Sequence, residues 1–282
     1  MKLFLRNKFI DLDDPLVMGI LNITPDSFSD GGSFLDVDAA LEQAGLMIKS
    51  GAEIIDVGGE STRPGAHKID IDEEIDRILP VIKEIKAKFD VLVSVDTSKE
   101  RVAKVAVLEG GADIVNDISA LSFSLNMAET IANLSVPVVL MHIKGTPVNM
   151  QNNPGYINVI EEIKEYFNER IDFAVSKGIK REKIIIDPGI GFGKRVEDNI
   201  EILKNLDQFL EFELPILVGL SRKSFLGKIS REEDPGKREA ETITANIISI
   251  LKGASILRVH NVENCVKSIK ILKEFNNFPH FS

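Results

Sequence analysis

The sequence predicts an α/β protein built as one (β/α)₈ barrel, and three observations support this. Short apolar runs alternate with longer segments in which apolar residues return every three or four positions, as they do on one face of a helix. The apolar runs are nearly continuous, which is typical of parallel strands covered on both faces. Polar and glycine-rich clusters follow the runs at their carboxyl ends, where parallel barrels hold their active sites.

Eight apolar runs are the expected strands, and a helical segment follows each in units of about 30 to 35 residues. The strands are expected at residues 17–22, 54–57, 91–95, 114–116, 136–141, 184–186, 216–219 and 256–259. The helical period is plainest at residues 37–47 and 262–272, where apolar side chains follow the i, i+3, i+4, i+7 rule. A doubly wound open sheet is the alternative fold, because it has the same alternation of elements.

A single domain is expected over residues 1–282, because no linker, low-complexity stretch or shift in composition divides the chain. Residues 1–15 precede the first expected strand and are predicted to be a short extra N-terminal segment, a hairpin at the floor of the barrel. Residues 228–237 are polar and contain Asp234-Pro235-Gly236, so we expect a loop between the seventh strand and its helix.

Composition restricts the classes of partner. With 34 Lys and Arg against 44 Asp and Glu, the net charge is −10, so no nucleic acid is expected as a partner. No uncharged apolar run approaches the roughly 18 residues that span a bilayer, so no membrane is expected either. The single cysteine, Cys265, cannot form an internal disulfide or a multi-thiolate metal site. We expect a cytoplasmic protein that binds small molecules.

Three oxygen-bearing side chains follow expected strands and should meet at the barrel mouth: Asp96, Asn116 and Asp187. Two carboxylates and an amide match the edge of a heterocycle rich in N–H donors. The alternative is that these residues are turn residues and helix caps. Asn22 and Asp26 add oxygen atoms suited to Mg²⁺, which usually binds through few protein ligands together with substrate phosphates.

Four cationic side chains come from the second, seventh and eighth loops: Arg63, Lys223, Arg258 and His260. On one rim of an acidic protein they indicate an anion site, and the last two loops are the usual phosphate position of such barrels. Ser224 is expected to begin a helix, whose first N–H groups attract anions. Each cation alone is better explained as a solvated surface charge, whereas the four together favour an anion site.

Aromatic and histidine side chains near the expected mouth each have two interpretations. Phe28 and Phe192 lie among glycine and small polar residues and suit the cover of an aromatic substrate, with local packing as the alternative. His142 follows an apolar strand and is either a hydrogen-bonded packing residue or a binding residue.

Six segments together resemble the dihydropteroate synthase family of folate biosynthesis, in the order in which that family has them. They are residues 18–32 (MGILNITPDSFSDGG), 58–65 (GGESTRPG), 94–97 (SVDT), 187–194 (DPGIGFGK), 219–227 (GLSRKSFLG) and 258–260 (RVH). The resemblance covers nearly the whole chain. It implies a TIM barrel that condenses 6-hydroxymethyl-7,8-dihydropterin pyrophosphate with p-aminobenzoate to 7,8-dihydropteroate and pyrophosphate. It also implies assistance by Mg²⁺, a dissociative (SN1-like) displacement, and a homodimer.

The resemblance assigns roles residue by residue. It implies that Asp96, Asn116, Asp187 and Lys223 bind the pterin while Arg258 stacks on its ring. The pyrophosphate is implied at Asn22, Arg63, Arg258 and His260, with Asn22 also on the metal. The p-aminobenzoate pocket is implied at Thr62, Pro64, Phe28, Phe192, Lys223 and Ser224. The expected catalytic residues are Asp96, Asp187, Lys223 and Asp30, the last accepting a hydrogen bond from the attacking amine.

Two residues depart from the pattern that this family often shows: Asn261 stands where it often has Asp, and Ala120 where it often has Gly. The first puts a contact to His260 in doubt, and the second puts the shape of one loop in doubt. The alternatives to a synthase are a methyltetrahydrofolate-dependent corrinoid methyltransferase and a non-catalytic pterin-binding protein. Residues 221–224 and the segment around Asn22 favour the synthase over the methyltransferase, which needs neither a p-aminobenzoate pocket nor a pyrophosphate site. The presence of Arg63, Lys223 and His260 argues against a non-catalytic protein.

Overall fold

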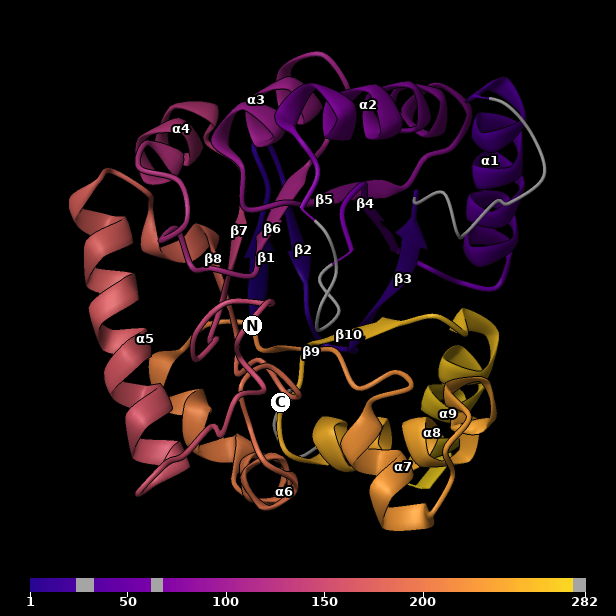
Figure 1. Ribbon diagram of the computed structural model, residues 1–282. Coiled ribbons are helices and arrows are strands. Elements are labelled where there is room, and N and C mark those ends of the chain that lie inside the picture. The colour runs from indigo at the N-terminus through magenta and orange to yellow at the C-terminus, as the bar shows by residue number, and fades with distance from the viewer. Residues whose placement is uncertain (24–32, 62–67, 276–282) are drawn as a thin grey trace.

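The chain folds as a barrel of parallel strands surrounded by helices, in a computed structural model that describes residues 1–23, 33–61 and 68–275 (Figure 1). The strands are β3 (Leu16–Asn22), β4 (Ile54–Gly58), β5 (Leu92–Asp96), β6 (Ile114–Asp117), β7 (Val138–Met141), β8 (Ile184–Asp187), β9 (Leu217–Val218) and β10 (Ile256–Val259). They pair in parallel in the order β8-β7-β6-β5-β4-β3-β10-β9. A bridge between Ile186 and Ile216 joins the two edges of the sheet. The predicted (β/α)₈ barrel is confirmed, and the doubly wound open sheet is wrong.

Helices connect successive strands and cover the outside of the barrel. They are α1 (Ser33–Lys49), α2 (Ile71–Lys88), α3 (Glu100–Leu108), α4 (Met127–Leu134), α5 (Val159–Ser176), α6 (Val196–Lys204), α7 (Ser224–Ser230), α8 (Glu239–Leu251) and α9 (Val262–Phe275). Short 3₁₀ turns lie at Arg181–Lys183, Leu206–Phe212 and Pro235–Lys237. Both α7 and α8 lie between β9 and β10, so the expected loop at 228–237 contains the end of α7 and a 3₁₀ turn.

Helix α2 shows how the local sequence sets these elements. Asp70 caps its first turn by accepting a hydrogen bond from the N–H of Glu73 at 2.8 Å. Ile78, Val81 and Ile85 recur at helical spacing and are fully buried against the sheet. The capped, one-sided segment thus forms a helix and packs on the barrel.

The interior of the barrel has an apolar lower layer and a polar upper layer. One cluster of buried side chains fills the lower layer, with Met18, Ile54, Leu92, Ile114, Val139, Ile185, Leu217 and Ile256 each pointing inward from its strand. Side chains alternate between the two faces of a strand, so the next inward positions lie two residues further on. Those positions include Asp56, Ser94 and Asn116, which begin the polar layer toward the carboxyl ends.

The N-terminal segment closes the amino end of the barrel. Strands β1 (Lys2–Phe4) and β2 (Phe9–Asp11) form an antiparallel hairpin. Leu3, Leu5 and Leu12 are buried in the same cluster as the inward residues of the barrel strands. The extra segment expected from the sequence is therefore a hairpin that completes the floor.

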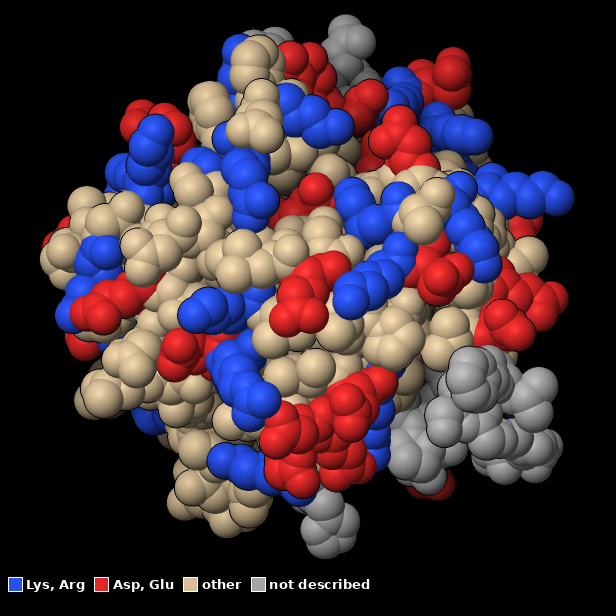
Figure 2. All heavy atoms as spheres, turned by 90° about the horizontal axis from the view of Figure 1, so that it is seen from above, with Lys and Arg blue, Asp and Glu red and all other residues tan. Residues whose placement is uncertain are grey.

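The surface carries both signs of charge. Seen from above, Lys and Arg side chains are interspersed with Asp and Glu (Figure 2); the full sequence holds 34 residues of the first kind and 44 of the second. Within the residues that the structure describes, no helix combines the length and the apolar character needed to cross a bilayer.

Candidate active site

The carboxyl ends of the barrel strands bring the predicted oxygen-bearing residues together. Strand register aligns Gly58 with Asp96, Asp96 with Asn116, and Met141 with Asp187. The three predicted side chains are 7%, 4% and 6% exposed in the order Asp96, Asn116, Asp187. They line the upper layer of the barrel interior, as the sequence predicted.

Arg258 connects these groups into one network. Its Nε donates to Asp56 Oδ2 at 2.6 Å, and its Nη2 donates to Asp96 Oδ2 at 2.7 Å. Asn116 Nδ2 also donates to Asp56 Oδ2, at 3.1 Å. In the structure Arg258 thus pairs with two buried carboxylates from neighbouring strands.

Asp56 is a functional candidate that the sequence reasoning missed. Asp56 is fully buried, with an exposed fraction of 0%. It lies inside β4, whereas the carboxylates predicted from the sequence lie at or beyond the ends of their strands. The signal was available: a carboxylate stands within a strand whose next inward position, Gly58, adjoins Asp96.

Burial controls the protonation of the carboxylates. It raises the pKa of Asp96 to about 7, although the charge of Arg258 acts to lower it. It raises the pKa of Asp187 to about 6, opposed first by the Gly189 N–H, which donates to Asp187 Oδ1 at 2.7 Å, and then by Lys223. The mouth therefore holds carboxylates that exchange protons near neutral pH.

Three buried oxygen atoms in this layer have no hydrogen-bond partner among the described residues: Asp56 Oδ1, Ser94 Oγ and Asp96 Oδ1. Nearly all buried polar groups of folded proteins are hydrogen-bonded, so such acceptors are an exception that needs an explanation. A ligand that presents N–H donors to β4 and β5 would satisfy them. The geometry thus supports the predicted donor-edge site.

Lys223 and Phe192 form the neighbouring wall. Lys223 Nζ lies 4.2 Å from the centroid of the Phe192 ring. Desolvation lowers the pKa of Lys223 to about 8, opposed first by the charge of Asp187. Gly191 has a φ of +86°, and a Cβ there would lie 3.0 Å from Lys223 Cδ, so glycine leaves room for the lysine stem. Ser224 begins α7, as predicted, and is exposed.

His260 and Asn22 lie at the ends of their strands. His260 Nδ1 is 2.9 Å from Ser221 Oγ, and the His260 N–H donates to the same oxygen at 3.3 Å. Asn22 ends β3 and is half-buried; its Oδ1 lies 3.7 Å from where a Cβ on Gly58 would be. The described residues contain no group of three or more His, Cys, Asp or Glu side chains that could hold a metal ion.

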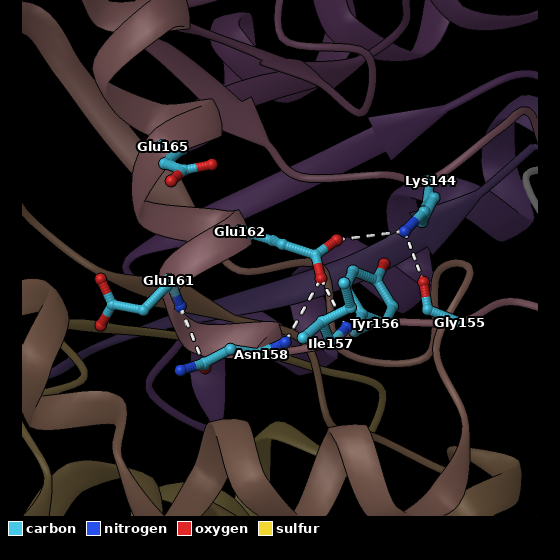
Figure 3. Close-up of a pocket in the computed structure, with 8 residues that line it drawn as sticks. All are labelled: Lys144, Gly155, Tyr156, Ile157, Asn158, Glu161, Glu162 and Glu165. Atoms are coloured by element: carbon cyan, nitrogen blue, oxygen red, sulfur yellow. Dashed lines mark hydrogen bonds and ion pairs between the residues drawn. The ribbon is translucent and has the colours of Figure 1, made fainter.

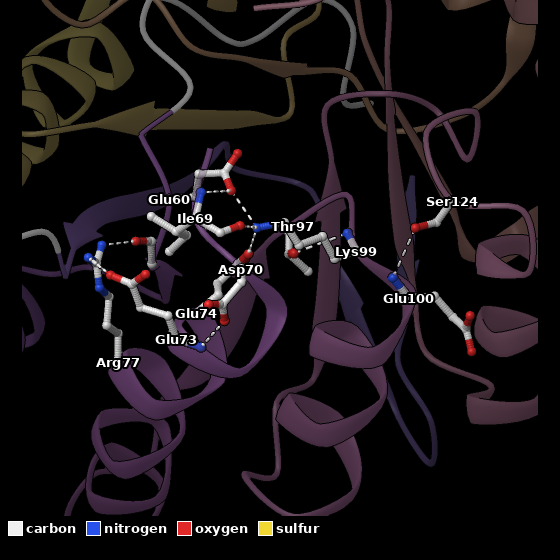
Figure 4. Close-up of polar contacts among 11 residues, drawn as sticks. Glu60, Ile69, Asp70, Glu73, Glu74, Arg77, Thr97, Lys99, Glu100 and Ser124 are labelled. Atoms are coloured by element: carbon white, nitrogen blue, oxygen red, sulfur yellow. Dashed lines mark hydrogen bonds and ion pairs between the residues drawn. The ribbon is translucent and has the colours of Figure 1, made fainter. Parts of the chain in front are cut away.

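The remaining predicted residues lie outside the described part of the chain. These are Asp26, Phe28, Asp30, Thr62, Arg63 and Pro64. The described residues on either side of 62–67 are held by one charged cluster (Figure 4). Lys99 Nζ donates to the Ile69 carbonyl at 2.8 Å, to the buried Glu74 Oε2 at 2.6 Å and to Glu60. This cluster lies beside Asp96 and borders a small cavity of about 120 Å³.

His142 is a hydrogen-bonded packing residue. It is 5% exposed, and its Nδ1 lies 2.8 Å from Lys194 Nζ. Its ring also packs edge-on against Tyr166, with centroids 4.8 Å apart. Of the two interpretations that the sequence left open, the structure supports packing.

The two departures from the family pattern have local explanations. Asn261 Oδ1 accepts the N–H of Asn264 at 3.1 Å, so this side chain caps the first turn of α9. Ala120 adopts a left-handed φ of +47°. Asp117 holds that loop, because its two carboxylate oxygens accept the N–H groups of Ser119 and Leu121 at 2.8 Å each.

A larger surface pocket of about 670 Å³ lies outside the barrel mouth, at the start of α5 (Figure 3). Lys144 Nζ bonds to the Gly155 carbonyl and to Glu162 Oε2, and Glu162 Oε1 accepts the Ile157 N–H at 2.7 Å. Because these polar groups already pair with each other, the carboxyl-end site is the stronger candidate for ligand binding.

Comparison with known proteins identifies the family. The profile of the pterin-binding enzymes matches residues 18–260. The dihydropteroate synthase of Escherichia coli (strain K12) is 44% identical over 273 residues, covering 97% of this chain and 96% of that protein. The dihydropteroate synthase of Synechocystis sp. is 45% identical over 255 residues, covering 90% and 88%.

Solved structures agree with this assignment. A Yersinia pestis dihydropteroate synthase in complex with a sulfonamide drug has a TM-score of 0.92 at 42% identity, covering 98% of this chain and 99% of that one. The Xanthomonas albilineans enzyme with 4-aminobenzoic acid has a TM-score of 0.91 at 39% identity, with 99% of each chain covered. The same enzyme with 7,8-dihydropteroate has a TM-score of 0.89 at 36% identity, covering 99% and 100%. With matches of this extent over a barrel that holds the expected polar floor, the chain belongs to the dihydropteroate synthase family.

Proposed function

We propose that the chain condenses 6-hydroxymethyl-7,8-dihydropterin pyrophosphate with p-aminobenzoate to give 7,8-dihydropteroate and pyrophosphate, in folate biosynthesis. The observation that carries this proposal is the set of unpaired buried acceptors, Asp56 Oδ1, Ser94 Oγ and Asp96 Oδ1. A flat heterocycle with several N–H donors can supply hydrogen bonds to these oxygen atoms. Relatives named dihydropteroate synthase, and their complexes with 4-aminobenzoic acid and 7,8-dihydropteroate, support the choice of substrates.

The pterin is held by charge and by hydrogen bonds in a water-poor layer. Asp96 and Asp187 accept N–H groups of the ring, Asn116 adds an amide, and Lys223 donates to the ring edge. Arg258 stacks on the ring face after exchanging part of its pairing with Asp96. In a site of low dielectric these interactions are stronger than they would be in water.

The displacement breaks the C–O bond between the pterin methylene and the pyrophosphate, and the electron pair leaves with pyrophosphate. Positive charge then spreads from the methylene carbon into the ring, where the carboxylates of Asp96 and Asp187 stabilise it. The amine of p-aminobenzoate attacks that carbon, forms the C–N bond and releases a proton. Asp30 accepts the hydrogen bond from the amine in this proposal.

The leaving group and the second substrate occupy the rim. Arg63, Arg258 and His260 bind the pyrophosphate. Asn22 offers an amide oxygen at the end of β3, which suits Mg²⁺ because this ion usually takes few protein ligands besides substrate phosphates. Mg²⁺ bound there would neutralise part of the charge on the leaving pyrophosphate.

In this proposal p-aminobenzoate binds beside Lys223 and Phe192, together with residues of the first and second loops. Phe192 and Lys223 face the aromatic ring, and Ser224 binds the carboxylate at the start of α7. We assign Phe28, Thr62 and Pro64 to the same pocket. The aromatic ring of Phe192 and the cationic side chain of Lys223 beside it suit an aromatic anion.

The direct test incubates the purified chain with the pterin pyrophosphate, Mg²⁺ and p-aminobenzoate and measures dihydropteroate by chromatography. We expect product formation that depends on all three. Pterin binding without product would support the corrinoid methyltransferase or the non-catalytic alternative. Omitting p-aminobenzoate is the control for hydrolysis of the pyrophosphate ester.

We also propose a homodimer in the cytoplasm. Helices α7 and α8 pack against each other (Figure 1). They carry three large apolar side chains that are exposed: Ile229, Ile248 and Leu251. We place the contact between subunits at these helices, near the later barrel strands. The buried free thiol of Cys265 suits a reducing compartment.

A further inference from the structure

We propose that Lys194 is a positioning residue that holds the loop between β8 and α6 in the shape that presents Phe192 to the second substrate. This inference rests on the proposed function for its kinetic test and stands on the geometry of the loop itself.

The ammonium of Lys194 is enclosed by acceptors from two segments. Lys194 is 4% exposed. Its Nζ lies 2.8 Å from His142 Nδ1, 2.9 Å from the Gly189 carbonyl oxygen, 3.1 Å from that of Phe192 and 3.3 Å from that of His142. An ammonium has three donors and no acceptor, so the His142 contact requires a lone pair on Nδ1. The group therefore fastens the loop after β8 to the end of β7.

The loop can approach this cation because of its glycines. Gly189, Gly191 and Gly193 have φ values of +65°, +86° and +63°, in the region that side chains other than glycine rarely adopt. A Cβ on Gly189 would overlap the carbonyl of His142, and one on Gly193 would press on the carbonyl of Lys144. The backbone is thus wrapped tightly over the segment after β7, with carbonyl oxygens turned toward Lys194.

Two residues of the candidate active site lie at or in this loop. Asp187 precedes it and accepts the Gly189 N–H at 2.7 Å. Phe192 lies within it, and its ring faces Lys223 Nζ at 4.2 Å. Asp187 belongs to β8 and is held by the sheet, whereas Phe192 depends on the loop. Loss of the ammonium should therefore displace Phe192 more than Asp187.

The protonation state of His142 is consistent with this arrangement. Burial, followed by the charge of Lys194, lowers the pKa of His142 well below its ordinary value, so the imidazole is neutral and can accept. Burial lowers the pKa of Lys194 to about 7, while the charge of Asp187 acts to raise it.

The test compares Lys194→Met with Lys204→Met, an exposed lysine in the last turn of α6. For Lys194→Met we expect the KM for p-aminobenzoate to rise about tenfold, with the affinity for the pterin pyrophosphate changing less than about threefold. Lys204→Met should resemble the wild type. A fall in kcat with both KM values unchanged, in proportion to lost folded protein, would show a purely structural role and overturn the proposal.

His142 supplies the conservative pair. Asn at position 142 keeps a side-chain acceptor near the place of Nδ1, whereas Leu removes it. We expect His142→Leu to raise the KM for p-aminobenzoate as Lys194→Met does, and His142→Asn to restore it most of the way. Equal effects of the two substitutions would contradict a role that runs through this hydrogen bond.

Hydrogen exchange separates this proposal from the proposed function. The amides of residues 189–193 should exchange faster in Lys194→Met than in the wild type or Lys204→Met, whether or not product is formed. If the wild type makes no dihydropteroate, the proposed function fails while the exchange data still test the loop. Unchanged exchange in this loop would sink the positioning role.

Discussion

At the scale of single residues, the polar layer of the active site consists of buried charges of opposite sign that pair with each other. Asp56 accepts hydrogen bonds from both Arg258 and Asn116, so it orients the two residues that we propose to bind the face and the edge of the pterin ring. Asp96 shares the same guanidinium. Burying a charge is costly unless it is paired, which makes each partner sensitive to substitution.

Replacing Asp56 with Asn should weaken binding of the pterin pyrophosphate about tenfold, because Arg258 and Asn116 lose their shared charged acceptor. Calorimetric titration with the pterin substrate, without p-aminobenzoate, measures this. Asp113→Asn is the matched control, since Asp113 forms its ion pair with Lys86, on another part of the barrel. Equal affinity in wild type and Asp56→Asn would remove Asp56 from the site.

The raised pKa of Asp187 predicts a dependence of stability on pH. Its value is about 6 in the folded chain against an ordinary 3.8, so the folded state holds this proton more tightly than the unfolded state does. The stabilisation is present below about pH 4 and is lost as pH rises toward 6. The free energy of unfolding should be measured with urea for the wild type and Asp187→Asn as pH rises from about 4 through 6. Relative to the wild type, that of Asp187→Asn should increase by about 3 kcal/mol. A difference in free energy of unfolding that does not change with pH would contradict the raised pKa of Asp187.

At the scale of elements, local chemistry explains where helices and loops depart from expectation. The fifth strand was expected from Val136, but β7 begins at Val138, because Pro137 has no N–H to give to the ladder. Ala120 takes a left-handed conformation because Asp117 and Arg170 fix the backbone on both sides of it, the latter by donating to the Ala120 carbonyl at 2.8 Å.

Ala120→Gly should raise the free energy of unfolding by about 1 kcal/mol, because glycine adopts this φ without strain. The matched control is Ala112→Gly, at a buried position whose φ is not positive, which should be destabilised. Denaturant unfolding of both variants checks the sign. Destabilisation of Ala120→Gly to the same extent as Ala112→Gly would show that the left-handed φ carries no strain.

At the scale of the whole molecule, periodicity was enough to predict the barrel. Nearly continuous apolar strands and one-faced helices leave few other packings, and the parallel order follows from the helical crossovers. The convergence of Asp96, Asn116 and Asp187 followed from that topology. Asp56 was missed because its strand is otherwise apolar. The cluster around Lys194 was missed because its partners come from two separate loops and become neighbours only on folding.

The proposed dimer makes a prediction at this scale. Ile248→Glu should give a particle of about 31.2 kDa by light scattering, and the wild type one of twice that mass. Ile248 is 43% exposed on α8, and a charge there would be buried unpaired in the subunit contact. Leu46→Glu, on α1 and 54% exposed, is the control and should stay dimeric. A monomeric wild type would contradict the dimer.

The hairpin that completes the floor has a practical consequence. The Met1 carbonyl accepts the Leu12 N–H at the amino end of the barrel, while those groups assigned to chemistry that the structure describes lie at the carboxyl end. A tether joined to the first residue would therefore attach the molecule by its base. On a sensor surface, immobilised copies should present their mouths to the solution and titrate substrate like the unattached protein.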